Sequence, residues 1–128
     1  MRIEEPVLIS REQLAESHDP AFVAALQQVN DGEEKPTAER FCLGNDDSPL
    51  FNGVFDYTLL YSSATLTAAD LIIEQNANVV FNPLGGFSHA SRAHCEGFCY
   101  ANDVIAAIDR FLARGFRVAY LDIDAHHA

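Results

Sequence analysis

Cysteine and basic residues are scarce in this chain of 128 residues, and tryptophan is absent. Eight lysine and arginine residues stand against nineteen aspartate and glutamate residues, and the formal net charge of -11 repels the phosphate backbone of nucleic acids. No run of roughly 18 apolar residues occurs, and no basic segment followed by an apolar one opens the chain. We therefore expect no nucleic-acid partner, no membrane anchor and no signal peptide.

The chain has three cysteines, Cys42, Cys95 and Cys99. They are too few for a disulfide framework, and an odd number cannot all pair within one chain. This usage favours a reducing compartment, and we expect a cytoplasmic protein. His94 lies beside Cys95, but a structural zinc site needs four ligands, and no convincing fourth ligand is nearby in the sequence. Buried free thiols are therefore the expected state of Cys95 and Cys99.

The composition, with 48% hydrophobic and 21% charged residues, is typical of one compact domain. Two helix starts are marked in the first part of the chain, by Ser10 with Gln13 three residues later and by Asp19 followed by Pro20. His18, between these helices, is expected to be an ordinary residue of a helix cap. The density of turn residues predicts an irregular loop after the second helix, over residues 31–49.

Apolar spacing predicts further helices over residues 53–61 and 65–75, separated by Ser62 and Ser63. The second part of the chain then has the order strand, helix, strand. A short apolar run predicts a buried strand at residues 79–81, and a second strand follows at 117–122. The helix between them covers residues 102–114, and this order predicts a right-handed parallel βαβ unit in an α/β fold.

Polar residues of unusual type follow both predicted strands. The sequence GGFSHA, which includes His89, follows the first strand, and Asp122, Asp124 and His126 follow the second. Sites in open parallel sheets gather beyond the carboxyl ends of the strands, and alternation along an extended chain would put the last three side chains on one face. Carboxylates and imidazoles are ligands for zinc and similar divalent metals. Strand-end acids that cap neighbouring helices are the alternative interpretation.

Three blocks of the sequence resemble signature blocks of the histone deacetylase family, which includes bacterial acetoin-utilisation and acetylpolyamine-hydrolase relatives. They are GGFSHA at residues 85–90, GFCYAND at residues 97–103 and DIDAHH at residues 122–127. The blocks also occur in the family's order and at its spacing. A weaker match covers LGNDDSP at residues 43–49 and GVFDY at residues 53–57.

This resemblance implies a zinc-dependent amide hydrolase on a three-layer arginase/deacetylase-like α/β fold with a parallel sheet. The 128 residues would form a single partial domain of that fold. Asp124 and His126 resemble two of the three metal ligands, and His89 resembles the general base and acid. Asp122 resembles the carboxylate that partners a histidine of the family, and together with the region of Asp124 and His126 it would help to bind a monovalent cation such as potassium.

The resemblance also implies the substrate contacts. Gly97 and Phe98 would line the tunnel for an acylated lysine, and Asp47 resembles the rim carboxylate that holds the substrate backbone. The expected substrates are an acetyl-lysine peptide or a small acylated amine such as an acetylpolyamine.

Two departures from the family pattern affect these expectations. Ser88 stands where the family has the first histidine of a pair, which leaves room for a Ser88–Asp122 hydrogen bond but supplies no positive charge. The third metal-ligand aspartate and the carbonyl-polarising tyrosine have no counterpart before the end at Ala128. We therefore expect the 128 residues alone to have no appreciable deacetylase activity and to form homo-oligomers through uncovered strand edges. A non-catalytic, truncated paralogue that acts as a binding or assembly module is the alternative.

Overall fold

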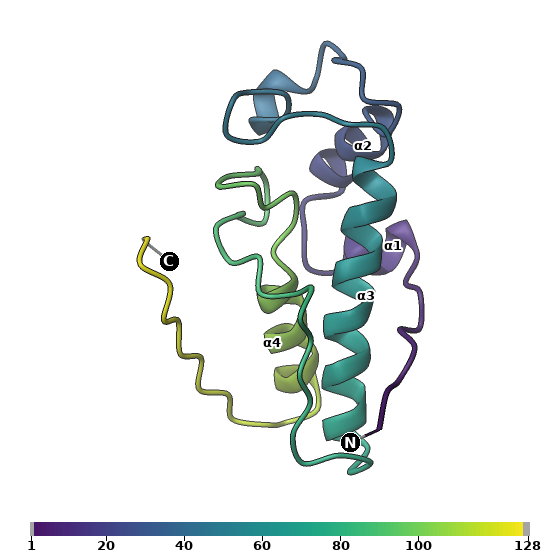
Figure 1. Ribbon diagram of the computed structural model, residues 1–128, viewed down its shortest axis with the longest axis vertical. Coiled ribbons are helices and arrows are strands. Elements are labelled where there is room, and N and C mark those ends of the chain that lie inside the picture. The colour runs from purple at the N-terminus through teal and green to yellow at the C-terminus, as the bar shows by residue number, and fades with distance from the viewer. Residues whose placement is uncertain (1, 127–128) are drawn as a thin grey trace.

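The computed structural model describes residues 2–126, and helices dominate the architecture (Figure 1). Figure 1 shows α3 and α4 lying side by side, with the extended C-terminal segment on the far side of α4 from α3. His127, the last residue of the DIDAHH block, and Ala128 lie outside the described residues. The helices are α1 (Arg11–Leu14), α2 (Pro20–Gln28), the 3-10 helix η1 (Glu39–Phe41), α3 (Val54–Ile73) and α4 (Asp103–Ala113).

The predicted helix starts of α1 and α2 are confirmed by their caps. The Gln13 backbone N–H donates to the Ser10 hydroxyl at 3.3 Å, and the Ser10 backbone N–H donates to the Gln13 side chain at 2.9 Å. Asp19 accepts from the first backbone N–H groups of α2, and Pro20 occupies the first helical position. Each cap satisfies donors that have no partner within the helix, which is why these residue types start helices.

The prediction of two helices separated by Ser62 and Ser63 is wrong, because α3 runs without a break from Val54 to Ile73. Both serines are buried in the helix interior. The Ser63 hydroxyl donates to the Leu59 carbonyl at 2.6 Å, so its polar group is satisfied one turn back within the helix. The same hydroxyl accepts the Ile9 backbone N–H at 2.9 Å and ties the N-terminal segment to α3.

The hydrophobic core lies where α2, the first half of α3 and the loop before α4 meet. Tyr61 is its largest fully buried side chain, and its hydroxyl exchanges hydrogen bonds with the backbone of Ala101 at 2.9 and 2.7 Å. The Phe87 ring packs on the Tyr61 ring with centroids 4.3 Å apart. The core therefore holds the loop around residue 87 directly against α3. Other members are Phe22, Val23, Leu26, Val29, Phe41, Leu43 and Tyr100.

The parallel sheet is not found among residues 2–126. The segments 79–81 and 117–122 are free of helix, but neither carries a strand ladder. Val79 and Phe81 are 86% and 84% exposed, and Leu121 is 82% exposed. A parallel strand needs hydrogen-bonded neighbours and cover on both faces, and these segments have neither in the described part of the chain. None of the described helices is both long and apolar enough to cross a membrane.

The core packing predicts the effect of two matched leucine substitutions. Leu26→Ala removes a side chain that is 0% exposed and should lower the free energy of unfolding by about 2–5 kcal/mol, because it leaves a cavity. Leu121→Ala, at a side chain that is 82% exposed, should change it by less than about 0.5 kcal/mol. Urea denaturation of both variants measures this, and equal losses would contradict the described core.

Candidate metal centre

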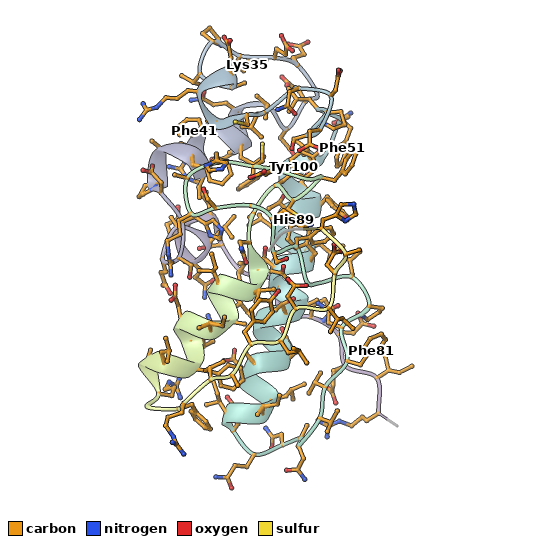
Figure 2. All side chains as sticks on the ribbon, turned by 90° about the vertical axis from the view of Figure 1, so that its left-hand side faces the viewer. Lys35, Phe41, Phe51, Phe81, His89 and Tyr100 are labelled. Atoms are coloured by element: carbon orange, nitrogen blue, oxygen red, sulfur yellow. The ribbon has the colours of Figure 1, made fainter. Side chains whose placement is uncertain are left out.

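His89, Asp124 and His126 converge, although His89 lies far from the other two in sequence. One ligand atom from each residue lies within 4.8 Å of the others. The two imidazole rings meet edge to face, with centroids 6.2 Å apart and an interplanar angle of 86°. Figure 2 labels His89 on the side of the molecule along which the C-terminal segment runs. Carboxylate and imidazole groups, here from Asp124 and His126, are donors that zinc takes in catalytic sites, and the His89 imidazole lies beside them, so the residues present fit a zinc site.

Asp124 and His126 are already organised by local hydrogen bonds. The Asp124 carboxylate accepts the His126 backbone N–H at 2.6 Å, and the same oxygen lies 2.8 Å from His126 Nδ1. These bonds, the backbone one above all, lower the pKa of Asp124 and favour the ionised form that binds metals. The side chains are 46% and 79% exposed, so this half of the site is open to solvent.

The predicted link between Ser88 and Asp122 is present. The Ser88 hydroxyl donates to Asp122 Oδ2 at 3.1 Å, and the Tyr120 hydroxyl donates to the same oxygen. The other oxygen accepts the Asp124 backbone N–H at 2.9 Å. The Tyr120 hydrogen bond, followed by that from the Asp124 N–H, lowers the pKa of Asp122. Hydroxyls thus surround a carboxylate that stays ionised, and they donate hydrogen bonds to it without cancelling its charge.

Asp103, at the first position of α4, holds the glycine turn that precedes His89. This carboxylate is 0% exposed and accepts the backbone N–H groups of Gly86 at 2.9 Å and Phe87 at 2.8 Å. The Thr65 hydroxyl of α3 also donates to it. A Cβ atom on Gly85 would lie 2.4–2.7 Å from side-chain atoms of this cluster, which is why only glycine fits there.

Asn102, the N-cap of α4, holds the next part of the same loop. Its side-chain amide group donates to the carbonyls of Ser88 and Ala90, both at 2.8 Å, and these residues flank His89. Its side-chain oxygen accepts the Ile105 backbone N–H at 2.8 Å and so starts α4. One buried side chain therefore fixes both the helix start and the backbone on either side of His89.

Gly97, Phe98 and Asp47 form a second turn beside His89. The Gly97 N–H donates to the Asp47 carboxylate at 2.6 Å, and the Phe98 N–H donates to the Asp47 carbonyl at 2.9 Å. A Cβ atom on Gly97 would come within 2.9–3.1 Å of the His89 side chain, so the absence of a side chain lets the turn approach that ring. Phe98 is 60% exposed.

A cavity of about 470 Å³ lies beside His89. Its wall is apolar at Val104 and Ile105 of α4 and polar at Ser88, His94 and Tyr120. The space therefore borders the candidate cluster at His89, on the side of α4.

Cys95 and Cys99 are buried free thiols, as predicted. Burial raises the pKa of Cys95 to about 11 and also raises the pKa of Cys99, so both stay protonated near neutral pH. Neither belongs to a group of potential metal ligands among residues 2–126.

Sequence reasoning missed the supporting roles of Asp103 and Asn102. Both residues belong to the predicted helix over 102–114 and to the GFCYAND block, but neither was given a role in holding the loop before the helix. The available signal was the pair of cap-forming residues at the start of α4, directly after a loop rich in glycine, whose backbone needs hydrogen-bond partners.

The Asp103 contacts predict a loss of stability that a control with the same change of charge should not show. Asp103→Asn puts an amide N–H₂ where one carboxylate oxygen accepts, so backbone donors of the turn lose partners. Hydrogen bonds to charged groups contribute roughly 1.5–3 kcal/mol, and we expect a loss of about that size in the free energy of unfolding. Asp46→Asn, at an exposed position, is the matched control and should change stability by less than about 0.5 kcal/mol in the same urea titration. No loss in Asp103→Asn, or equal losses in the two variants, would contradict the assignment.

Comparison with known proteins identifies the family. The chain matches the histone deacetylase domain over residues 2–128. It is 34% identical to histone deacetylase 8 of Xenopus laevis over 98% of this chain and 39% of that protein, and 35% identical to histone deacetylase 8 of Danio rerio over 99% of this chain and 34% of that protein. Identity to human histone deacetylase 1 is 32%, over 99% of this chain and 27% of that protein. The chain thus spans well under half the length of these relatives, and it belongs to the histone deacetylase family.

Proposed function

We propose that this protein is a zinc-dependent hydrolase of N-acyl amides, with an acetyl-lysine peptide or an acetylpolyamine as substrate. The observation that carries the proposal is the convergence of His89 with Asp124 and His126 in a chain of this family. The reaction adds water across an amide and releases a carboxylate and an amine. The comparisons do not favour the non-catalytic alternative.

Asp124 and His126 are the residues of this chain that would hold zinc. A bound zinc ion supplies Lewis acidity, which polarises a carbonyl and brings the pKa of water down to about 7. The lowered pKa of Asp124 supports this assignment, because a metal ligand must be deprotonated. Asp122, ionised and turned toward its hydroxyl partners, is the residue proposed to contribute to a potassium site.

His89 is proposed to move the proton. It would take a proton from the attacking water and give it to the leaving amine nitrogen, the two roles of one general base and acid. The base must lie within hydrogen-bond reach of the reacting atoms, and the position of His89 against the ligand pair supports that role. The hydrogen bonds from Asn102 to the carbonyls of Ser88 and Ala90 limit the movement of its backbone.

Substrate contacts follow from the turn beside His89. Phe98 offers an exposed aromatic surface for an acyl-lysine chain, and the close approach of Gly97 to His89 puts this surface beside the base. Asp47 would hold the substrate backbone at the rim. Its carboxylate already accepts the Gly97 N–H, so it also fixes the turn that it shares with the substrate.

Self-association stays part of the proposal, as does a cytoplasmic setting. Large apolar side chains are exposed on both extended segments, and apolar surface of this kind favours association. They include Val79, Phe81, Leu121 and Ile123.

Metal binding is the first test. We expect the 128-residue chain to bind one Zn²⁺ per molecule in isothermal titration calorimetry, and His126→Ala to weaken binding at least about tenfold, since loss even of a residue that only supports a ligand costs that much. His94→Ala is the control because the His94 ring is hydrogen-bonded to the Ser91 hydroxyl and is not part of the cluster of His89, Asp124 and His126. Unchanged affinity in His126→Ala would contradict the assignment.

A variant of His89 separates its two chemical options. If His89 is the base, His89→Ala keeps the zinc affinity. If His89 is instead a third ligand, the affinity falls as it does in His126→Ala.

Catalysis is the second test and uses the zinc-loaded protein as its gene encodes it. We expect hydrolysis of a fluorogenic acetyl-lysine peptide, and a fall in kcat of roughly 10²–10⁴-fold in His89→Ala, the usual contribution of a general base. His94→Ala should leave kcat unchanged. A wild-type protein without zinc-dependent turnover on acetyl-lysine or acetylpolyamine, or an active His89→Ala variant, would refute the proposed function.

A further inference from the structure

His18 is a buried titratable group that the proposed reaction does not use. It lies between α1 and α2, is 4% exposed, and packs near the Phe22 ring at a centroid distance of 6.3 Å. Sequence reasoning treats it as an ordinary cap residue, but its side chain points into the protein. A buried imidazole needs hydrogen-bond partners for both ring nitrogens, and those partners decide what it does.

The partners of His18 fix its protonation form. Nδ1 lies 3.2 Å from the Leu14 carbonyl, which can only accept, so Nδ1 carries the proton. Nε2 accepts the Asn102 backbone N–H at 3.0 Å, so Nε2 must keep its lone pair. Protonation of Nε2 would place two N–H groups face to face and remove this hydrogen bond. The contacts are therefore compatible only with the neutral ring that carries its proton on Nδ1.

The contact with Asn102 connects His18 to the loop that carries His89. The Asn102 side chain holds the carbonyls on both sides of His89, as described above. The backbone of Asn102 is in turn positioned by His18, from a helix pair more than eighty residues earlier in the chain. His18 thus joins the Asn102 N–H to the Leu14 carbonyl at the end of α1.

We propose that His18 is a positioning residue, which in its neutral form sets the placement of His89 through Asn102. The catalytic part of this inference rests on the proposed function. The structural part does not, because it concerns only the path of residues 88–90.

The surroundings of the ring favour the neutral form. Burial is the main cause that lowers the pKa of His18, and the nearby Arg92 guanidinium acts in the same direction. The Leu14 carbonyl and the carboxylates of Asp109 and Asp103 on α4 act in the opposite direction. Asp109 also binds Arg92 through two hydrogen bonds, at 2.7 and 3.0 Å, so these two charges largely offset each other.

The sign of the pH effect follows from linkage. Because the folded-state pKa of His18 lies below its ordinary value near 6.5, the unfolded chain binds more protons below that pH. The stability that His18 contributes is complete above about pH 6.5 and is lost as the pH falls below it. We expect a decrease in the urea midpoint between about pH 6.5 and 5 that is smaller in His18→Gln, which cannot titrate, and unchanged in the control His94→Gln.

Matched substitutions at constant pH test the positioning role. His18→Gln keeps a side-chain acceptor for the Asn102 N–H, and His18→Leu fills the space without one. At pH 7.5, we expect His18→Leu to shift the amide resonances of residues 88–90 and 102 in ¹⁵N–¹H spectra, and His18→Gln to restore them toward wild type. We expect kcat to fall by up to roughly 10²-fold in His18→Leu, the cost of about 1 Å of misplacement, with KM nearly unchanged and partial rescue in His18→Gln.

Three results would overturn the proposal. The first is a proton on Nε2 of His18 in long-range ¹H–¹⁵N spectra of the wild-type chain, which remains decisive if His18→Leu does not fold. The second is a folded His18→Leu variant with unshifted amides at 88–90. The third is an equal shift in the Gln and Leu variants. If wild-type protein has no hydrolase activity, the proposed function fails, while the NMR results still decide the positioning role.

Discussion

The site depends on one constraint: the backbone of the loop before α4 must find hydrogen-bond partners without a sheet to supply them. Asn102 and Asp103, adjacent at the start of α4, provide these partners. The Asp103 carboxylate accepts hydrogen bonds from the N–H groups of the glycine turn. The Asn102 side-chain amide donates hydrogen bonds to the carbonyls on either side of His89. A carboxylate accepts and an amide group donates, so the two neighbours serve opposite ends of the same loop. Both are buried, which makes the loss of either partner costly.

The two halves of the candidate site differ in how firmly they are held. His89 lies on the loop that is fixed by α4 and packed through Phe87 on Tyr61. Asp124 and His126 lie on an extended segment whose side chains are largely exposed. The Ser88–Asp122 hydrogen bond joins the loop of His89 to the C-terminal segment, so it helps to fix the position of one half of the site relative to the other. The half with His89 is therefore held against the core, and the half with Asp124 and His126 is more open to solvent.

Local signals in the sequence identified the helix starts, because a cap depends on a few adjacent residues such as Ser10 and Gln13. The predicted break in α3 was wrong because tertiary packing overrides the low helix propensity of Ser62 and Ser63, both of which are buried. The strands at 79–81 and 117–122 depend on neighbours, which a short apolar run cannot specify. The spacing of Asp122, Asp124 and His126 suggested the ligand pair. The contact of His18 with Asn102 spans 84 residues, and no local pattern marks it.

Ser88, where the resemblance to the family implies a histidine, gives Asp122 a hydrogen-bond partner that is neutral. A histidine at this position would neutralise Asp122 whenever it is protonated, whereas the hydroxyls of Ser88 and Tyr120 donate hydrogen bonds and leave the negative charge in place. Those hydrogen bonds keep the pKa of Asp122 low, so the carboxylate does not escape its charge by binding a proton. Asp122 and Asp124 then place two negative charges near the imidazoles of His89 and His126. A site with two carboxylates of lowered pKa favours cations.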